Sequence, residues 1–132
     1  MKLLPILLLA FVLSLGVACS SEPAFESVQQ EARAYVNRGL EYHALGQHEK
    51  AIQSYDKAIR LNPQNAQTYN KRGVVRADLG QYERAIQSYN EAIRLDPEYA
   101  TTYYNRGNAF KALGNSIKAE QDLAKAKELG VY

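Results

Sequence analysis

Charged residues are absent from the start of the chain, and polar and apolar positions recur in a regular pattern over the rest. No charged residue occurs between Leu3 and Ser21. The nineteen residues that begin at Leu45 agree at fourteen positions with the nineteen that begin at Leu79. A weaker third copy begins at Leu113, again thirty-four residues later. Repeats of this length predict a stacked array in which each unit buries its apolar face on its neighbour.

Each unit is predicted to form two antiparallel helices joined by a glycine turn. The units are assigned to residues 32–65, 66–99 and 100–132. The first helices are expected at roughly 32–45, 66–79 and 100–113, and the second helices at roughly 48–61, 82–95 and 116–129. A glycine directly after a first helix closes it in the left-handed conformation, and these glycines are Gly46, Gly80 and Gly114. Prolines that end the second helices are Pro63 and Pro97.

Small residues indicate how the two helices of a unit meet. Glycine inside a helix costs about 1 kcal/mol relative to alanine, so its recurrence predicts a close approach of the second helix. These internal glycines are Gly39, Gly73 and Gly107. The matching small surface is expected from pairs of alanines seven residues apart, namely Ala51 with Ala58, Ala85 with Ala92, and Ala119 with Ala126.

The period, the frame of glycine, alanine and proline, and the aromatic residues Tyr35, Tyr69 and Tyr103 resemble the tetratricopeptide repeat. The resemblance covers residues 32–132. It implies an all-α fold, an α-solenoid of three helix-turn-helix repeats wound as a right-handed superhelix. Most members of the family bind peptides or partner proteins in a concave groove, so the resemblance also implies a protein–protein interaction function.

The ends of the array carry substitutions that are expected to cap it. Isoleucines of the first two units give way to Glu120 and Lys127 in the third unit, which makes the outer face wettable. At the other end, residues 24–31 are predicted to extend the first helix, with Phe25 and Val28 covering its outer side. The residues expected to keep the inward face of the third unit apolar are Ile117, Leu123 and Leu129.

By the resemblance, the concave surface is formed by first-helix residues that flank the internal glycine. The predicted peptide-binding residues are Val36, Asn37, Leu40, Asn70, Lys71, Val74, Tyr104, Asn105 and Asn108. Other residues expected on this surface are His43, Ala77 and Lys111. Asparagine can both donate to and accept from a peptide backbone, so the surface suits an extended segment or a short helix. The residues differ among the units, which fits either a ligand-specific groove or ordinary drift of a solvated surface.

One speciality of the family is not expected here. Co-chaperone members clamp a C-terminal carboxylate with a set of lysine, asparagine and arginine residues. The corresponding positions are Val36, Leu40, Lys71, Thr101 and Asn105. Lys71 is the only basic residue among these five, so the resemblance does not imply recognition of a chaperone tail.

The apolar start of the chain predicts an export signal. Lys2, the uncharged run and the small residues that follow it have the composition of a secretory signal. The sequence LGVAC, which ends at Cys19, resembles the lipobox of bacterial lipoproteins. This implies a signal peptide at residues 1–18, lipidation of Cys19, and a tether with the helix extension at residues 19–31. The expected location is the bacterial cell envelope. Ser20 favours the outer membrane where the organism has one; otherwise the plasma membrane is expected. An uncleaved anchor and ordinary secretion are the alternatives.

Composition and motifs argue against catalysis, cofactors and nucleic acid. The formal net charge of +2 is too small for a nucleic-acid surface, which needs clustered Lys and Arg. No phosphate loop, nucleophile elbow, HExxH or CxxC motif occurs, so neither an enzyme nor a cofactor is expected. His43 and His48 flank the Gly46 turn, but two imidazoles without a placed carboxylate or thiolate make a poor zinc site. They are interpreted as packing residues, and no metal is predicted.

An arginine recurs one residue before each internal glycine, at Arg38, Arg72 and Arg106. One hypothesis is a basic series offered to an acidic partner. The favoured interpretation is structural: each stem packs within its unit, and the guanidinium meets a nearby acid or carbonyl. Strict repetition favours this interpretation because a repeat reuses its internal contacts.

Together these features predict a membrane-anchored adaptor that binds a peptide or protein partner without turnover. An alternative is an envelope assembly factor, such as a pilotin or a secretion-machinery helper, which needs one stoichiometric partner. A third is an enzyme or a cell-wall accessory protein, suggested by the compartment alone. The oligomeric state is open: a monomer is favoured, and a homo-oligomer through the groove is the alternative.

Overall fold

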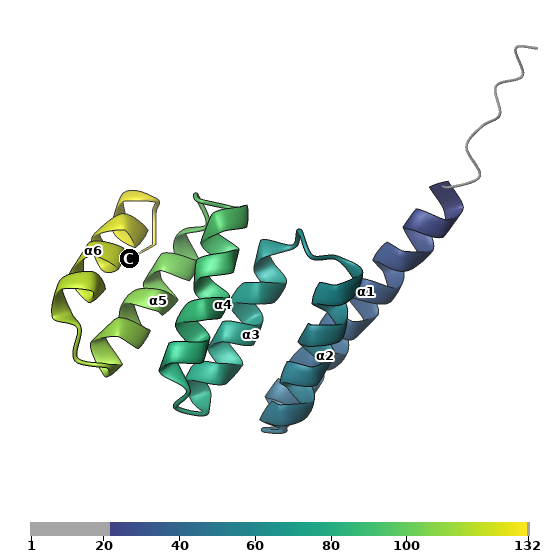
Figure 1. The fold of residues 1–132 in the computed structure, drawn as a ribbon, viewed down its shortest axis with the longest axis horizontal. Helices are drawn as coiled ribbons and strands as arrows, with labels where there is room; N and C mark the ends of the chain where they lie inside the picture. Colours follow the sequence, from purple (N-terminus) through teal and green to yellow (C-terminus); the bar gives the residue numbers. More distant parts are fainter. Residues whose placement is uncertain (1–21, 132) are drawn as a thin grey trace, which may run out of the picture.

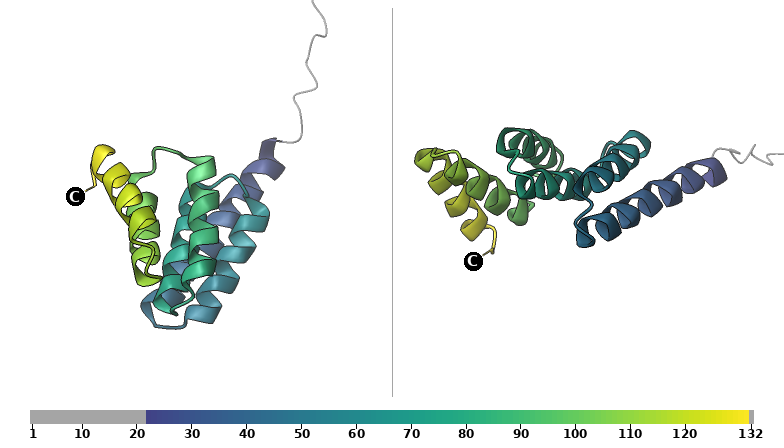
Figure 2. Two further views of the ribbon diagram at one scale, coloured as in Figure 1. Left: turned by 60° about the vertical axis from the view of Figure 1, so that its left-hand side comes forward. Right: turned by 90° about the horizontal axis from the view of Figure 1, so that it is seen from below.

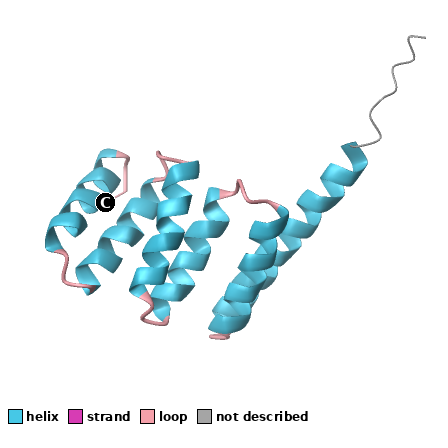
Figure 3. Ribbon diagram, viewed as in Figure 1, coloured by secondary structure: helices cyan, strands magenta, loops and turns pink. Residues whose placement is uncertain are grey.

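The computed structural model describes residues 22–131, which form six α-helices and no β-strand (Figure 3). The helices are α1 (Glu22–Ala44), α2 (His48–Leu61), α3 (Ala66–Asp78), α4 (Tyr82–Leu95), α5 (Ala100–Ala112) and α6 (Ser116–Glu128). Their bounds agree with the predicted helices, except that α1 starts ten residues earlier, as the helix extension requires. The predicted signal peptide and Cys19 lie outside the described residues.

The helices pair into three hairpins that stack in chain order (Figure 1). Each helix packs on the one that follows it, and α3 also contacts α5 directly. The view from below in Figure 2 shows the successive hairpins side by side in a curved row. The described part of the chain is therefore an all-α solenoid, which confirms the predicted fold class.

Each hairpin turns at a glycine with a positive φ. The angle is +70° at Gly46, and the equivalent glycines have almost the same value. The Gly46 amide donates to the His43 carbonyl at 2.9 Å, and the Gln47 amide donates to the Tyr42 carbonyl at 2.8 Å. These bonds satisfy carbonyl groups that the end of a helix leaves free. The predicted role of the turn glycines is confirmed.

The core of the first two hairpins is built around a buried tyrosine in each. Tyr55 and Tyr89 are almost completely buried, and burial raises the pKa of Tyr55 to about 12. A Cβ atom on Gly39 would lie 2.5 Å from Cε1 of Tyr55, and one on Gly73 would lie 2.4 Å from Cε1 of Tyr89. The internal glycines therefore make room for a tyrosine ring, which corrects the expectation that they face the small alanines. In the third hairpin, Leu123 takes the place of the ring.

Arginine side chains link the hairpins. The guanidinium of Arg72 donates from Nη1 to Oδ1 of Asp56 in the preceding hairpin at 2.7 Å, and from Nε to Oγ of Ser88 in its own hairpin at 3.2 Å. It also lies over the ring of Tyr69, with its Cζ 5.4 Å from the ring centroid, a distance at which a cation and an aromatic face attract each other. These contacts join the first hairpin to the second.

Arg106 makes the equivalent link between the second and third hairpins. Its Nη1 donates to Oδ1 of Asn90 at 2.8 Å, and its Nε and Nη2 both bind the carboxylate of Asp122 at 2.7 Å. Arg38, in the first of the described hairpins, lies over the ring of Tyr35, with its Cζ 5.3 Å from the ring centroid. The structural interpretation of the arginine series is confirmed for Arg72 and Arg106.

The expected capping pattern of the third hairpin is correct in part. Glu120 and Lys127 are exposed, as predicted. Ile117, however, is 73% exposed, so its assignment to the inward face is wrong. The physical reason is its position in the first turn of α6, where the equivalent residues Glu49 and Glu83 also face solvent. The other residues expected on the inward face are half-buried, namely Leu123 and Leu129.

The first part of α1 projects beyond α2 (Figure 1). Gln29 accepts a hydrogen bond at 2.7 Å from Asn62, which directly follows α2. Residues before this contact run past the end of α2, so Phe25 is 67% exposed and Val28 is also exposed. Both residues were expected to cover the outer side of the first helix, but their side chains are exposed. Among the described helices, none combines the length and apolar composition that crossing a lipid bilayer requires.

Candidate functional site

A hollow with a volume of about 330 Å³ lies between the second and third hairpins, formed by α3, α4 and α5. Its walls combine small apolar residues, two tyrosines, two asparagines and one carboxylate. The lining residues are Val74, Ala77, Asp78, Tyr82, Tyr89, Asn105, Asn108, Ala109 and Ala112. This volume is within the range of small-ligand pockets, and it suits one or two side chains of a peptide.

The hollow exists because two positions carry alanine. Ala77 is the last residue but one of α3, and Ala112 is the last residue of α5. One repeat earlier, the positions equivalent to these alanines hold His43 and Asp78. The side chains of His43 and Asp78 meet at 2.6 Å, so the corresponding space at the first junction is occupied. The second junction is left open by the loss of both side chains.

Several residues that the sequence predicted for ligand binding come together in this hollow. Val74, Asn105 and Asn108 line it, as does Ala77. Asn108 is exposed, whereas Val74 and Asn105 are half-buried. Small apolar residues beside amide groups can bind a peptide side chain and its backbone together.

Asn70 has a different place from the one expected of a ligand-binding residue. It is only 5% exposed, and its Oδ1 accepts a hydrogen bond at 3.1 Å from Nδ2 of Asn105. Asn70 therefore presents little surface to a ligand. It instead holds the Asn105 amide in position from the neighbouring helix.

The remaining predicted residues do not join the same hollow. Val36 is half-buried beside a smaller cavity of about 110 Å³ that is lined by α1, α2 and α3 residues. Lys71 is half-buried. The exposed members of the predicted set, outside the hollow, are Asn37, Leu40 and Tyr104. The predicted surface is thus divided: part of it lines the open second junction, and the rest lies outside the hollow on the first helices of all three hairpins.

The phenol of Tyr89 is neutral at the base of the hollow. Burial raises the pKa of Tyr89 above its usual value, and the nearby carboxylate of Asp78 adds to the effect. The side chain of Asp78 is 46% exposed, so this carboxylate at the wall of the hollow is in contact with water. The neutral polar groups and the one acid can form hydrogen bonds with a ligand, and the apolar residues of the hollow can contact it.

Sequence reasoning missed five lining residues. They are Asp78, Tyr82, Tyr89, Ala109 and Ala112. The available signal was the difference between units at equivalent positions, because Ala77 and Ala112 replace larger residues of the preceding repeat. Tyr89 carries no such signal, since its equivalent in the first unit is also a tyrosine, Tyr55, whereas Tyr82 replaces His48.

Comparisons with known proteins agree with this architecture. The family model described as "TPR repeat" matches residues 39–80 and 75–114, and the model described as "Tetratricopeptide repeat" matches residues 100–129. No curated protein sequence matches the chain.

Solved structures include several similar folds. The second TPR of Spaghetti (RPAP3), bound to the HSP90 peptide SRMEEVD, is 29% identical, with a TM-score of 0.77 over 81% of this chain and 98% of that one. The Arabidopsis OM64 TPR domain is 26% identical, with a TM-score of 0.77 over 78% and 85% of the two chains. MamA is 28% identical, with a TM-score of 0.73 over 80% and 66%. With family models matched over more than half of its length, this chain belongs to the tetratricopeptide repeat family.

Proposed function

We propose that this protein is a membrane-anchored adaptor that binds a peptide segment of a partner protein in the hollow between α3, α4 and α5. The observation that carries the proposal is the hollow itself, in which small apolar residues lie beside the amide groups of Asn105 and Asn108. The fold is a protein-interaction scaffold, and the second TPR of Spaghetti is bound to a peptide. This similarity supports peptide binding in the present chain.

The bound segment is inferred to differ from the HSP90 peptide of that neighbour. Of the five positions that correspond to the carboxylate clamp, only Lys71 is basic, and it is half-buried. The hollow also carries the carboxylate of Asp78, which would repel an acidic chain end. An uncharged or basic segment with one apolar side chain fits these walls better.

Filling the hollow is expected to weaken partner capture. A photo-crosslinking amino acid at Asn108, which is exposed and lines the hollow, should yield a discrete crosslinked partner in intact cells, identified by mass spectrometry. Replacing Ala112 with phenylalanine places an aromatic ring in the hollow, and should reduce this product by about tenfold, the loss that corresponds to 1.4 kcal/mol of binding free energy.

The matched control for this experiment is Ala124→Phe. Ala124 is an exposed alanine of α6 that does not line the hollow, so this variant should crosslink like the unmodified protein. The crosslinker placed at Gln87, on the exposed side of α4, should yield no such product. A partner band that persists in Ala112→Phe would count against the hollow as the binding site.

The anchoring part of the proposal rests on the sequence LGVAC and the uncharged run before it. Replacing Cys19 with alanine is expected to move the protein from the membrane fraction to the soluble fraction, or to leave its precursor unprocessed, because acyl chains contribute about 0.8 kcal/mol per buried methylene group. Fractionation after a carbonate wash, together with incorporation of a labelled fatty acid, measures the effect. A Cys19→Ala protein that stays firmly in the membrane, with its labelling unchanged, would exclude the lipid anchor.

A further inference from the structure

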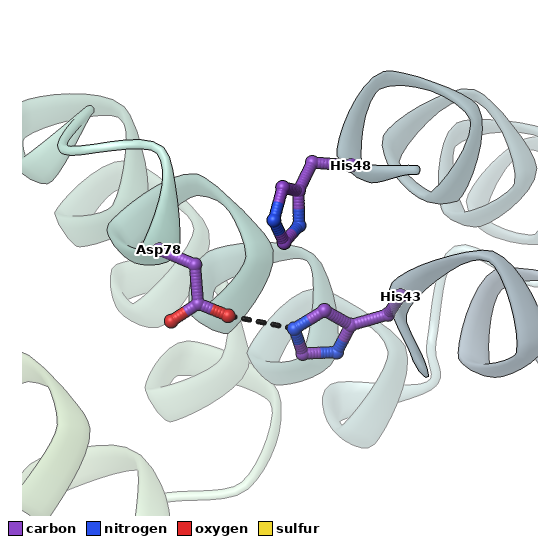
Figure 4. Close-up of side chains that lie close together, drawn as sticks. All are labelled: His43, His48 and Asp78. Carbon is purple, nitrogen blue, oxygen red and sulfur yellow. Dashed lines mark hydrogen bonds and ion pairs between the residues drawn. The ribbon is translucent and has the colours of Figure 1, made fainter. Parts of the chain in front are cut away.

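Three potential metal ligands meet at the junction between the first and second hairpins (Figure 4). His43 lies in the last turn of α1, His48 is the first residue of α2, and Asp78 is the last residue of α3. One ring nitrogen of each histidine and one carboxylate oxygen all lie within 4.8 Å of one another. Nε2 of His43 and Oδ2 of Asp78 are 2.6 Å apart, and the two imidazole centroids are 5.6 Å apart.

The chain brings these side chains together in two steps. The Gly46 turn folds α2 back on α1, which places the imidazoles of His43 and His48 at the same end of the hairpin. Stacking of the second hairpin then supplies Asp78 from thirty residues further along the chain. The sequence interpretation rejected a metal site because no carboxylate was placed near the histidines, and the structure places one there.

A second observation is that one ring nitrogen of His48 makes no hydrogen bond to the described residues. Its Nδ1 is buried and has no hydrogen-bond partner among the described residues. A buried ring nitrogen without a partner costs free energy, and coordination of a cation is one way to satisfy it. Both histidine residues are half-buried, while Asp78 is exposed, so an ion can reach the cluster from solvent.

The other repeats lack this set. At the second junction the equivalent positions hold Ala77, Tyr82 and Ala112, and in the third hairpin the positions of the two histidines hold Lys111 and Ser116. The three ligand types therefore occur together at a single junction of the described array. General packing needs of the repeat do not explain the full set, because equivalent positions elsewhere hold the small residues Ala77, Ala112 and Ser116.

We propose that His43, His48 and Asp78 bind a divalent transition-metal ion, with Zn²⁺ as the best match. Two imidazole nitrogens and one carboxylate oxygen are a ligand set that zinc accepts, with a fourth position left for water. Tetrahedral coordination at about 2.0–2.1 Å requires the ligand atoms to stand about 3.3 Å apart. The His43–Asp78 contact must therefore open slightly, and the His48 ring must move inward. Because the ligands come from α1, α2 and α3, the ion would brace the first hairpin against the second.

The repeats themselves supply the test variants. His43→Ala, His48→Tyr and Asp78→Ala each introduce the residue that the equivalent position holds in another repeat, so the packing of each variant has a precedent in the same chain. The full chain, purified in detergent with its tag removed, should bind one equivalent of Zn²⁺ in isothermal titration calorimetry, and Zn²⁺ should raise its melting temperature. Each variant should weaken binding by about tenfold or more and lose the rise in melting temperature.

Two controls separate this site from others. Cys19 is the only thiol of the chain, and Cys19→Ser should leave Zn²⁺ binding unchanged. Asp96→Ala removes an exposed acid at the end of α4 and should also bind normally. A chain that takes up no Zn²⁺ saturably, or whose binding survives both His43→Ala and His48→Tyr, would overturn the proposal.

A measurement on the unmodified chain avoids any question of folding in the variants. The chain contains two histidines, so their imidazole signals in a nuclear magnetic resonance spectrum can be assigned with one variant. Both signals should shift together during a Zn²⁺ titration and reach an end point at one equivalent, whereas Mg²⁺, which prefers oxygen ligands, should leave them in place. Imidazole signals that do not respond to Zn²⁺ would exclude the site directly.

Discussion

Replacing Arg106 with alanine is expected to lower the free energy of unfolding by about 3 kcal/mol, the lower end of the effect of breaking a buried ion pair. Asp122 is only 6% exposed, and both of its oxygens accept hydrogen bonds from Arg106 at 2.7 Å. The variant would leave this carboxylate with little solvent and without its partner. The Arg106 side chain is itself 20% exposed, which places the expected loss at the low end. Urea denaturation followed by circular dichroism measures it.

Two further variants show whether the unpaired carboxylate is the cause. The double variant Arg106→Ala/Asp122→Ser should recover most of the loss, because serine is the residue that the other two hairpins hold at this position. Arg94→Ala breaks the exposed pair with Glu91 and should cost less than about 0.5 kcal/mol. A single variant as stable as the unmodified chain, or a double variant no better than the single one, would contradict this account.

Gly73→Ala is expected to destabilise the protein by about 2 kcal/mol, within the usual range for overpacking, although alanine is the better helix former. The added Cβ would lie 2.4 Å from Cε1 of Tyr89, and the Tyr89 ring is 1% exposed and closely packed. Relief requires the ring or the helix α3 to move, and both are fixed by their neighbours. Because alanine stabilises a helix by about 1 kcal/mol relative to glycine, a net loss demonstrates that steric crowding is the larger effect. Thermal and urea unfolding provide the value.

The same change in the third hairpin is the matched control. A Cβ on Gly107 would lie 3.0 Å from Cγ of Leu123 and 3.2 Å from the Ala119 carbonyl oxygen. An aliphatic side chain can yield by a few tenths of an ångström, so Gly107→Ala should change stability little. Equal effects of the two substitutions would mean that the tyrosine ring is not what the glycine accommodates.

The helices and their stacking order could be predicted because their signals are local and occur three times. Gly46 and its equivalents close the first helices through backbone conformation alone, and prolines such as Pro63 stop the second helices. Such features depend on a few adjacent residues. Repetition then identifies the frame, since chance patterns do not recur at one spacing.

Contacts between helices were predicted less well because they depend on rotation about the helix axes. The ring of Tyr55 occupies the space above Gly39, although the small alanines of the same helix were the simpler expectation. Ile117 is exposed because its position, the second residue of a second helix, faces solvent, as it does at Glu49 and Glu83. The positions of apolar residues in the sequence do not say how far each helix is rotated about its axis.

The candidate sites arise where the repeats differ from one another, and sequence analysis concentrated on where they agree. The hollow follows from Ala77 and Ala112, which are inconspicuous residues until they are compared with His43 and Asp78 one repeat earlier. The histidine–aspartate cluster depends on a residue thirty positions away, which only the stacking of two hairpins brings close. Position-by-position comparison of the units shows these differences, and the stacking of the hairpins shows which of them meet.

The projecting start of α1 has a mechanical consequence for the proposed anchor. Between Glu22 and Gln29, where the hairpin first holds the helix, seven helical steps rise about 10 Å. A lipid on Cys19 would thus be attached three positions before Glu22, the start of this helix. Because a helix keeps its length, it would hold the array apart from the proposed lipid and so set how near the hollow comes to the bilayer.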